Sequence, residues 1–133
     1  MGLDVGDKTV GVAISDLLQM TAQGLETVRR ESNKQTYEDL KKIIDEYEIN
    51  KVVVGLPKNM DGSIGPQSEK VMKFASKLKN KYDIDLIYID ERLTTVSAER
   101  TLIEGDVSRA NRKKLIDQVA ASYILQFYLD SNG

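Results

Sequence analysis

A carboxylate interrupts an apolar segment near the start of this 133-residue chain. Asp4 separates Leu3 from Val5, and burying its charge costs free energy unless the carboxylate is paired or binds a metal ion. Gly2 and Gly6 flank it on the same face of a predicted strand and leave space for a ligand or a close backbone. In the structural alternative, Asp4 lies on an edge strand and simply faces water.

Asp90 and Glu91 come directly after the apolar run LIYI, at the carboxyl end of a predicted parallel strand. Open α/β sheets bind their ligands beyond the carboxyl ends of such strands. This position makes both acids candidate ligands for a metal ion or substrate. In the structural alternative, they serve Arg92 or cap the following helix.

Asp117 is a third unusual acid, since it lies beside the apolar face of a predicted helix. It falls on the shoulder of that face, where an acid is rarely found. A structural role would pair it with Lys113 one turn earlier, although Lys113 could instead contact a phosphate from the same side. The residues predicted to point inward are Leu115, Ile116, Val119, Ala120, Tyr123, Ile124 and Phe127.

Acids from a strand, a strand end and a late helix would form a site of hard oxygen ligands if the fold brings them together. Such ligands suit Mg²⁺ or Mn²⁺. The chain has no Cys and no His, which excludes disulfides, zinc–thiolate sites, thiol nucleophiles and an imidazole base. Paired metal ions hydrolyse phosphodiesters without a His base, because they activate water and stabilise the leaving oxygen. The pattern therefore favours metal-dependent phosphodiester hydrolysis.

Two segments could contact an anionic substrate. The net charge is −2, so nucleic-acid binding would need a local basic surface. The run SRANRKK at 108–114 contains Arg109, Arg112, Lys113 and Lys114 and no acid. Cations at a helix amino end oppose the macrodipole, so a polyanion partner explains them better than helix stability does, although a solvated helix start is the structural alternative. The loop at 55–65, which includes Lys58, is a candidate phosphate-binding loop.

The hydrophobic pattern predicts the elements that must position these residues. A meander of three strands followed by alternating strands and helices predicts an α/β fold, a mixed central sheet flanked by helices. The length fits one domain, 1–133. No apolar run is long enough to span a membrane and no signal peptide is visible, so we expect a cytoplasmic protein. Strands are predicted at 1–5, 9–15, 24–28, 51–56 and 84–89, and helices at 35–47, 66–82, 96–104 and 111–129.

These motifs, in this order, resemble the YqgF family, also called RuvX-like Holliday junction resolvases. The matching segments are 2–8 with 11–13, 55–57 with Gly62 and Gly65, 90–95 (DERLTT), and 116–117 with 120–121. The resemblance implies an RNase H-like fold and a metal-dependent nuclease for structured nucleic acid, linked in bacteria to maturation of the 5′ end of pre-16S rRNA. It implies that Asp4, Glu91 and Asp117 are the catalytic acids, with Asp90 as an auxiliary. Family members usually carry a residue or two more before the first glycine, so we expect a trimmed amino end.

The leading prediction is a Mg²⁺- or Mn²⁺-dependent phosphodiesterase for pre-rRNA or branched DNA. Resolution of a four-way junction would need a two-fold dimer, so we expect a monomer or a weak homodimer. An actin-like ATPase shares the opening hairpin by analogy, but such proteins enclose nucleotide between two lobes, for which this chain is too short. A non-catalytic RNA- or protein-binding module is the other alternative. The residues expected to contact phosphates are Lys58, Arg92, Arg109, Arg112, Lys113 and Lys114.

Overall fold

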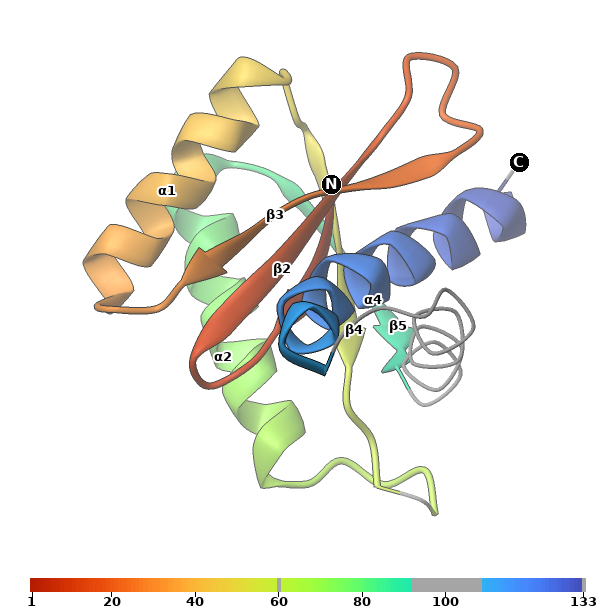
Figure 1. Cartoon of the computed structure of the whole chain (residues 1–133). Helices are drawn as coiled ribbons and strands as arrows, with labels where there is room; N and C mark the ends of the chain where they lie inside the picture. Colours follow the sequence, from red (N-terminus) through yellow and green to blue (C-terminus); the bar gives the residue numbers. More distant parts are fainter. Residues whose placement is uncertain (60, 92–108, 133) are drawn as a thin grey trace.

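A computed structural model describes residues 1–59, 61–91 and 109–132, with the side chains of 109–117 and of 132 outside the description. Its five strands form one sheet in the order β3-β2-β1-β4-β5 (Figure 1). The strands β1, β2 and β3 form an antiparallel meander, while β4 and β5 run parallel to β1. This arrangement confirms the predicted mixed sheet. The strands are β1 (Gly2–Val5), β2 (Thr9–Ser15), β3 (Ala22–Arg29), β4 (Lys51–Leu56) and β5 (Asp85–Asp90).

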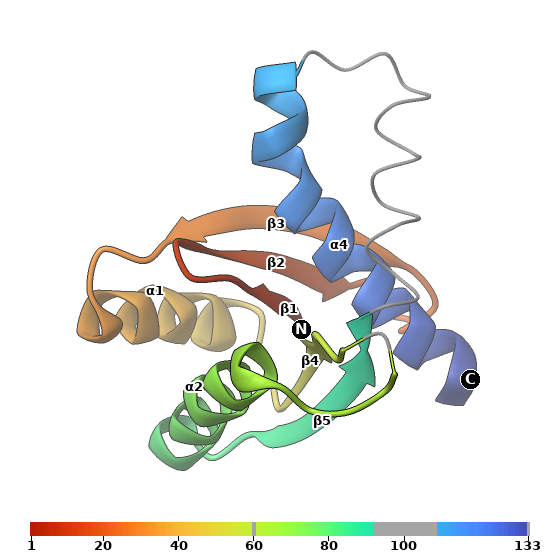
Figure 2. The ribbon, with the colours of Figure 1, turned by 90° about the horizontal axis from the view of Figure 1, so that it is seen from below.

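Helices cover both faces of this sheet. The helices α1 (Asn33–Glu46) and α2 (Pro66–Tyr82) lie on one face, and α4 (Arg109–Asn132) crosses the other (Figure 2). The β-branched run of β4 is buried along most of its length, as a central parallel strand requires. Within the part of the chain that the structure describes, no helix combines the length and apolar character needed to cross a membrane.

Most predicted boundaries differ slightly from those of the structure. The predicted strand 24–28 extends to 22–29, because backbone pairing such as Ser15 with Ala22 continues where the side chains are polar. The helix predicted at 35–47 begins at Asn33, since the Ser32 side chain accepts a hydrogen bond from the Gln35 backbone N–H. The last helix begins at Arg109 rather than at 111. The helix predicted at 96–104 lies outside the described residues.

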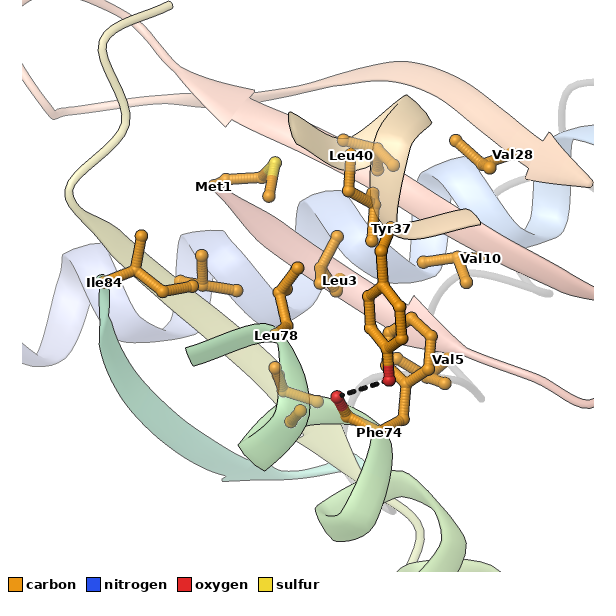
Figure 3. Close-up of a cluster of buried hydrophobic side chains, with 14 of the residues drawn as sticks. Met1, Leu3, Val5, Val10, Val28, Tyr37, Leu40, Phe74, Leu78 and Ile84 are labelled. Carbon is orange, nitrogen blue, oxygen red and sulfur yellow. Dashed lines mark hydrogen bonds between the residues drawn. The ribbon is translucent and has the colours of Figure 1, made fainter. Parts of the chain in front are cut away.

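The main hydrophobic core lies between the sheet and the helices α1 and α2 (Figure 3). Leu3 and Val5 of β1 enter it from the sheet. Tyr37 and Phe74 stack with ring centroids 4.9 Å apart, and the Tyr37 hydroxyl donates a hydrogen bond to the Phe74 carbonyl oxygen at 3.2 Å. Because neighbouring strand residues alternate between faces, Leu3 and Val5 in this core require Gly2 and Asp4 to face α4.

A smaller core fills the space between the sheet and α4. It contains Ala13 and Val53 from the sheet and Ala121, Ile124 and Leu125 from the helix. The chain approaches itself closely here: a Cβ placed on Gly2 would lie 2.7 Å from the carbonyl oxygen of Ala121. The glycine therefore lets α4 lie almost against the backbone of β1.

Candidate active site

Asp4 lies on the central strand of the sheet, so the interpretation of an edge-strand aspartate that faces water is wrong. It pairs with Gly11 of β2, and continuing the parallel register of Leu3 with Val54 by one residue places it beside Gly55 of β4. Neither neighbouring residue has a side chain of its own beside the carboxylate, and the Ile124 side chain of α4 lies over Gly55. Asp4 is also only partly buried. The carboxylate is therefore partly exposed on the α4 face of the sheet, with Gly11 on one side and Gly55 on the other.

Glu91 follows β5 directly and reaches the same glycine from the other side. A Cβ placed on Gly55 would lie 3.4 Å from Cγ of Glu91 and would collide with the Ile124 side chain. Since Ile124 belongs to α4, this contact puts Glu91 on the α4 face of the sheet. Asp4 and Glu91 thus approach Gly55 of the intervening strand on one face, although 86 positions separate them in the sequence.

Asp90 lies on the other side of the sheet from this pair. It ends β5 and pairs with Leu56, and alternation along the strand gives it the face of Tyr88. Tyr88 packs against the main core on the α1 and α2 side, whereas Ile89 packs on the α4 side. The structure therefore brings Glu91, and not Asp90, to the face that carries Asp4.

Asp117 belongs to the third described turn of α4, and only its backbone is described. It precedes Ala121 by four residues and Ile124 by seven, so the helical repeat puts its position on the same side of the helix as these two buried residues. Among the described side chains, no group of three or more acids is placed to hold a metal ion. The candidate site thus has two described acids and a third position on the helix that covers them.

The buried face of α4 differs from the predicted one. Ala121 and Leu125 are buried, while Phe127, which was predicted to point inward, is 44% exposed. The reason is steric: the glycines of β1 and β4 admit small side chains and a close backbone, so the helix packs through its alanines. With this face inward, Asp117 falls near its middle and not on its shoulder.

The predicted substrate-binding residues are described to different extents. Lys58 is partly buried in a loop held by its own polar groups, for example by the hydrogen bond from the Asn59 N–H to the Ser63 carbonyl at 2.9 Å. Arg92 lies outside the described residues. The four cations of the basic segment occupy the first two turns of α4, where only the backbone is described: Arg109, Arg112, Lys113 and Lys114.

Gly11 belongs to the matching segment 11–13, but the motifs did not reveal that it lies beside Asp4. Its place beside Asp4 follows from the tight turn between β1 and β2, where the Gly6 N–H donates to the Thr9 carbonyl at 2.8 Å. That turn fixes the antiparallel register, in which Val5 pairs with Val10 and Asp4 with Gly11. Extending the predicted hairpin backward from its turn would have identified this neighbour.

Comparison with solved structures establishes the fold. The chain is similar to T. thermophilus RuvC in complex with a Holliday junction substrate, with a TM-score of 0.61, 13% identity, and coverage of 98% of this chain and 94% of RuvC. It is similar to the fowlpox virus Holliday junction resolvase, with a TM-score of 0.57, 14% identity, and coverage of 99% and 97%. These likenesses confirm the RNase H-like fold.

Sequence comparison gives much closer relatives. One from Thermoanaerobacter pseudethanolicus, named "Putative pre-16S rRNA nuclease", is 61% identical over 98% of this chain and 95% of its own length. A relative of the same name from Clostridioides difficile is 59% identical over 98% of this chain and 92% of its own length. The family model described as "RuvX: Holliday junction resolvase" matches residues 1–131. The chain therefore belongs to the RuvX family.

Proposed function

We propose that this protein is a metal-dependent nuclease that hydrolyses phosphodiester bonds in structured nucleic acid, and that its substrate is the 5′ region of pre-16S rRNA. The observation that carries the proposal is the approach of Asp4 and Glu91 to Gly55 on one accessible face of the sheet. The names of relatives at 56–61% identity support the choice of substrate. Processing of rRNA precursors would place the protein in the cytoplasm.

The residues at this site suit a hard divalent cation. Asp4, Glu91 and Asp117 would hold Mg²⁺ or Mn²⁺, because all three offer carboxylate oxygens and the side chains of Asp4 and Glu91 are only partly buried. When bound, such ions make a hydroxide nucleophile available at neutral pH and stabilise charge on the leaving oxygen. Asp90 belongs to the opposite face, and we leave it out of this set.

The chain itself supplies positioning and proton transfer. Hydrolysis forms a bond between the water oxygen and phosphorus, breaks the bond to the leaving oxygen and moves one proton to that oxygen. With no His in the chain, Asp4 and Glu91 are suited to accept the water proton at a carboxylate oxygen. The basic segment at 109–114 and Lys58 would hold the flanking phosphates, so that the scissile group lies over the acids.

Resolution of Holliday junctions is the second candidate function. The description of the matching family model favours it, as does the shared fold with RuvC. Symmetric cleavage of a four-way junction requires two active sites related by a two-fold axis. A protein that stays monomeric while bound to a junction would favour the rRNA substrate.

A nuclease assay tests the proposed function. Labelled pre-16S 5′ fragments, four-way DNA junctions and plain RNA and DNA duplexes are incubated with the protein in Mg²⁺ or in EDTA. We expect cleavage of the rRNA precursor in Mg²⁺ and none in EDTA. If no substrate is cleaved and calorimetry detects no Mg²⁺ binding, the protein is a non-catalytic binding module.

Replacement of both Arg109 and Arg112 by alanine is expected to weaken substrate binding at every sequence. Each phosphate contact releases counterions and makes the decline of log affinity with log salt steeper. If each arginine contacts one phosphate, the slope for a duplex therefore becomes shallower by up to about 2 units in the variant. Affinity measured against salt in Ca²⁺ checks this without turnover. Calorimetric metal affinity is the control and stays unchanged, because arginine offers no oxygen ligand.

An unchanged slope in that experiment would show that the segment is an ordinary solvated helix start. The phosphate contacts would then lie at Lys58 and the loop that carries it.

A further inference from the structure

A second group of cations lies on the face of the sheet away from α4. Lys70, Lys73 and Lys77 are exposed on α2, and their spacing of three and four residues puts them on one side of the helix. Together with Arg30 they line an open cavity of about 260 Å³. We refer to Arg30, Lys70, Lys73 and Lys77 as the α2 cationic surface.

The side chain of Arg30 is held in place by its contacts with the rest of the protein. Its Nη1 donates to the Gly6 carbonyl oxygen at 2.5 Å, and its guanidinium carbon lies 4.8 Å from the centre of the Phe74 ring. The side chain is partly buried, and among the described residues no carboxylate forms an ion pair with it. A guanidinium has five N–H donors in a planar fork that matches a phosphate group. Arg30 therefore has donors left for an anion and is already oriented.

The three lysines are also available to a ligand. Within the described residues, the ammonium groups of Lys70, Lys73 and Lys77 have no hydrogen bond and no ion pair. Asp7 is the acid among the described residues that line the cavity, against four cations. A polyanion would thus meet an excess of positive charge, although the chain as a whole carries a net charge of −2.

The spacing of the lysines suits a regularly charged ligand. Lys81, whose ammonium lies 5.7 Å from the centre of the Tyr37 ring, continues the row. At 1.5 Å per residue the row from Lys70 to Lys81 is about 16 Å long. One strand of a duplex carries a phosphate about every 3.4 Å along its axis, so the row spans about five phosphates.

Among the described residues that line this cavity, the large apolar side chains of the kind that dominate protein interfaces are buried. Val71 and Phe74, which also line the cavity, are buried in the main core, and Figure 3 shows Phe74 there beside Tyr37. Affinity between proteins usually depends on such anchors rather than on solvated lysines. These features favour a nucleic acid over an acidic protein.

The position of this surface connects it with the candidate active site. The carbonyl that Arg30 binds belongs to Gly6, two residues after Asp4, in the turn that joins β1 to β2. Figure 1 shows this turn, the start of α2 and the start of α4 in the lower half of the view. A nucleic acid bound at Asp4 and Glu91 could extend past this turn and reach the α2 cationic surface on the other face of the sheet.

We propose that the α2 cationic surface binds the phosphate backbone of the nucleic acid that flanks the cleavage site. The identity of the ligand rests on the proposed function, while the binding of a phosphate polymer at Arg30 and the three lysines does not. The surface gives no base readout, so its contribution to affinity does not depend on sequence.

A binding experiment with matched variants tests this inference. The variant Lys73→Gln/Lys77→Gln removes two charges from the surface, and Lys42→Gln/Lys79→Gln removes two exposed charges from α1 and from the other side of α2. Affinity for a 24-base-pair RNA duplex is measured in EDTA between 50 and 300 mM salt, where no metal-dependent cleavage occurs. Circular dichroism checks that both variants are folded.

We expect the Lys73→Gln/Lys77→Gln variant to bind the duplex about tenfold more weakly near 100 mM salt. The slope of its log affinity against log salt should be shallower by about 1 to 2 units. The control variant should bind like the wild type. Equal weakening of both variants would reflect net charge alone and would overturn the inference, as would an unchanged first variant. Binding to poly-glutamate is measured in the same way. If the first variant loses affinity for poly-glutamate but keeps its affinity for the duplex, the surface binds an acidic protein and the inference is overturned.

These outcomes separate the inference from the proposed function. If the α2 surface binds the duplex but no substrate is cleaved in Mg²⁺, the nuclease proposal fails and the inference stands. If substrates are cleaved and the α2 variant binds and cleaves like the wild type, only the inference fails.

Discussion

Replacement of Asp4 by asparagine is expected to lower the rate of Mg²⁺-dependent cleavage at least about a thousandfold. Loss of a ligand that stabilises charge in the transition state costs about 4 kcal/mol, which corresponds to that factor. Asparagine keeps the shape of the side chain, and it lacks the negative charge. Initial rates on the best substrate of the nuclease assay measure the effect.

The same variant is expected to be as stable as the wild type, or more stable, when metal is removed. Asp4 and Glu91 approach one glycine on one face of the sheet, so removal of one charge relieves repulsion between like charges. Thermal unfolding in EDTA checks this. Asp85→Asn is the control for rate and stability, because this exposed residue begins β5 at the end remote from Glu91. A fall of more than about 5 °C in the Asp4→Asn variant would instead show that Asp4 has a structural role.

Replacement of Gly2 by alanine is expected to destabilise the fold by about 3 kcal/mol, which lowers the melting temperature by about 10 °C. The added Cβ would lie 2.7 Å from the carbonyl oxygen of Ala121 and 2.8 Å from Cβ of Leu125. Neither atom can move by side-chain rotation, so α4 must shift away from β1. Thermal unfolding followed by circular dichroism measures the loss.

Gly55→Ala provides a contrast to this variant. Its new Cβ would meet the end of the flexible Ile124 side chain and, at 3.4 Å, Cγ of Glu91. We therefore expect a smaller loss of stability and a larger loss of activity than for Gly2→Ala. A Gly2→Ala protein with the melting temperature of the wild type would show that α4 does not pack as closely on β1 as described.

The sheet was predictable because its signals are local. A tight turn at Gly6 joins two strands, and the β-branched run of β4 is apolar on both faces, as a covered parallel strand requires. The spacing of Gly2 and Gly6 indicated that Asp4 does not lie on a water-facing edge strand, and the structure places it on the central strand. These features depend on residues a few positions apart, which is the range over which sequence patterns are informative.

Features that depend on packing between distant elements were not predictable. The buried face of α4 is set by the glycines of β1 and β4, while hydrophobicity alone favoured larger residues such as Phe127. The assignment of Asp90 and Glu91 to opposite faces requires knowledge of where β5 ends. The lysines of α2 have the spacing of an ordinary solvated face, and only Arg30 beside them makes that spacing informative.

The order of elements along the chain has a consequence for when activity can arise during synthesis. All five strands, with Gly11 and Gly55 beside Asp4, have been synthesised once β5 has been made. The helix α4 follows all of them in the sequence. Until that helix docks, a nascent chain has Asp4 and Glu91 but lacks Asp117, and its Val53 and Ala13 are uncovered. Contacts of such high sequence separation form late in folding. The proposed site, with Asp117 as its third acid, can therefore form only after α4 has been synthesised and has docked on the sheet.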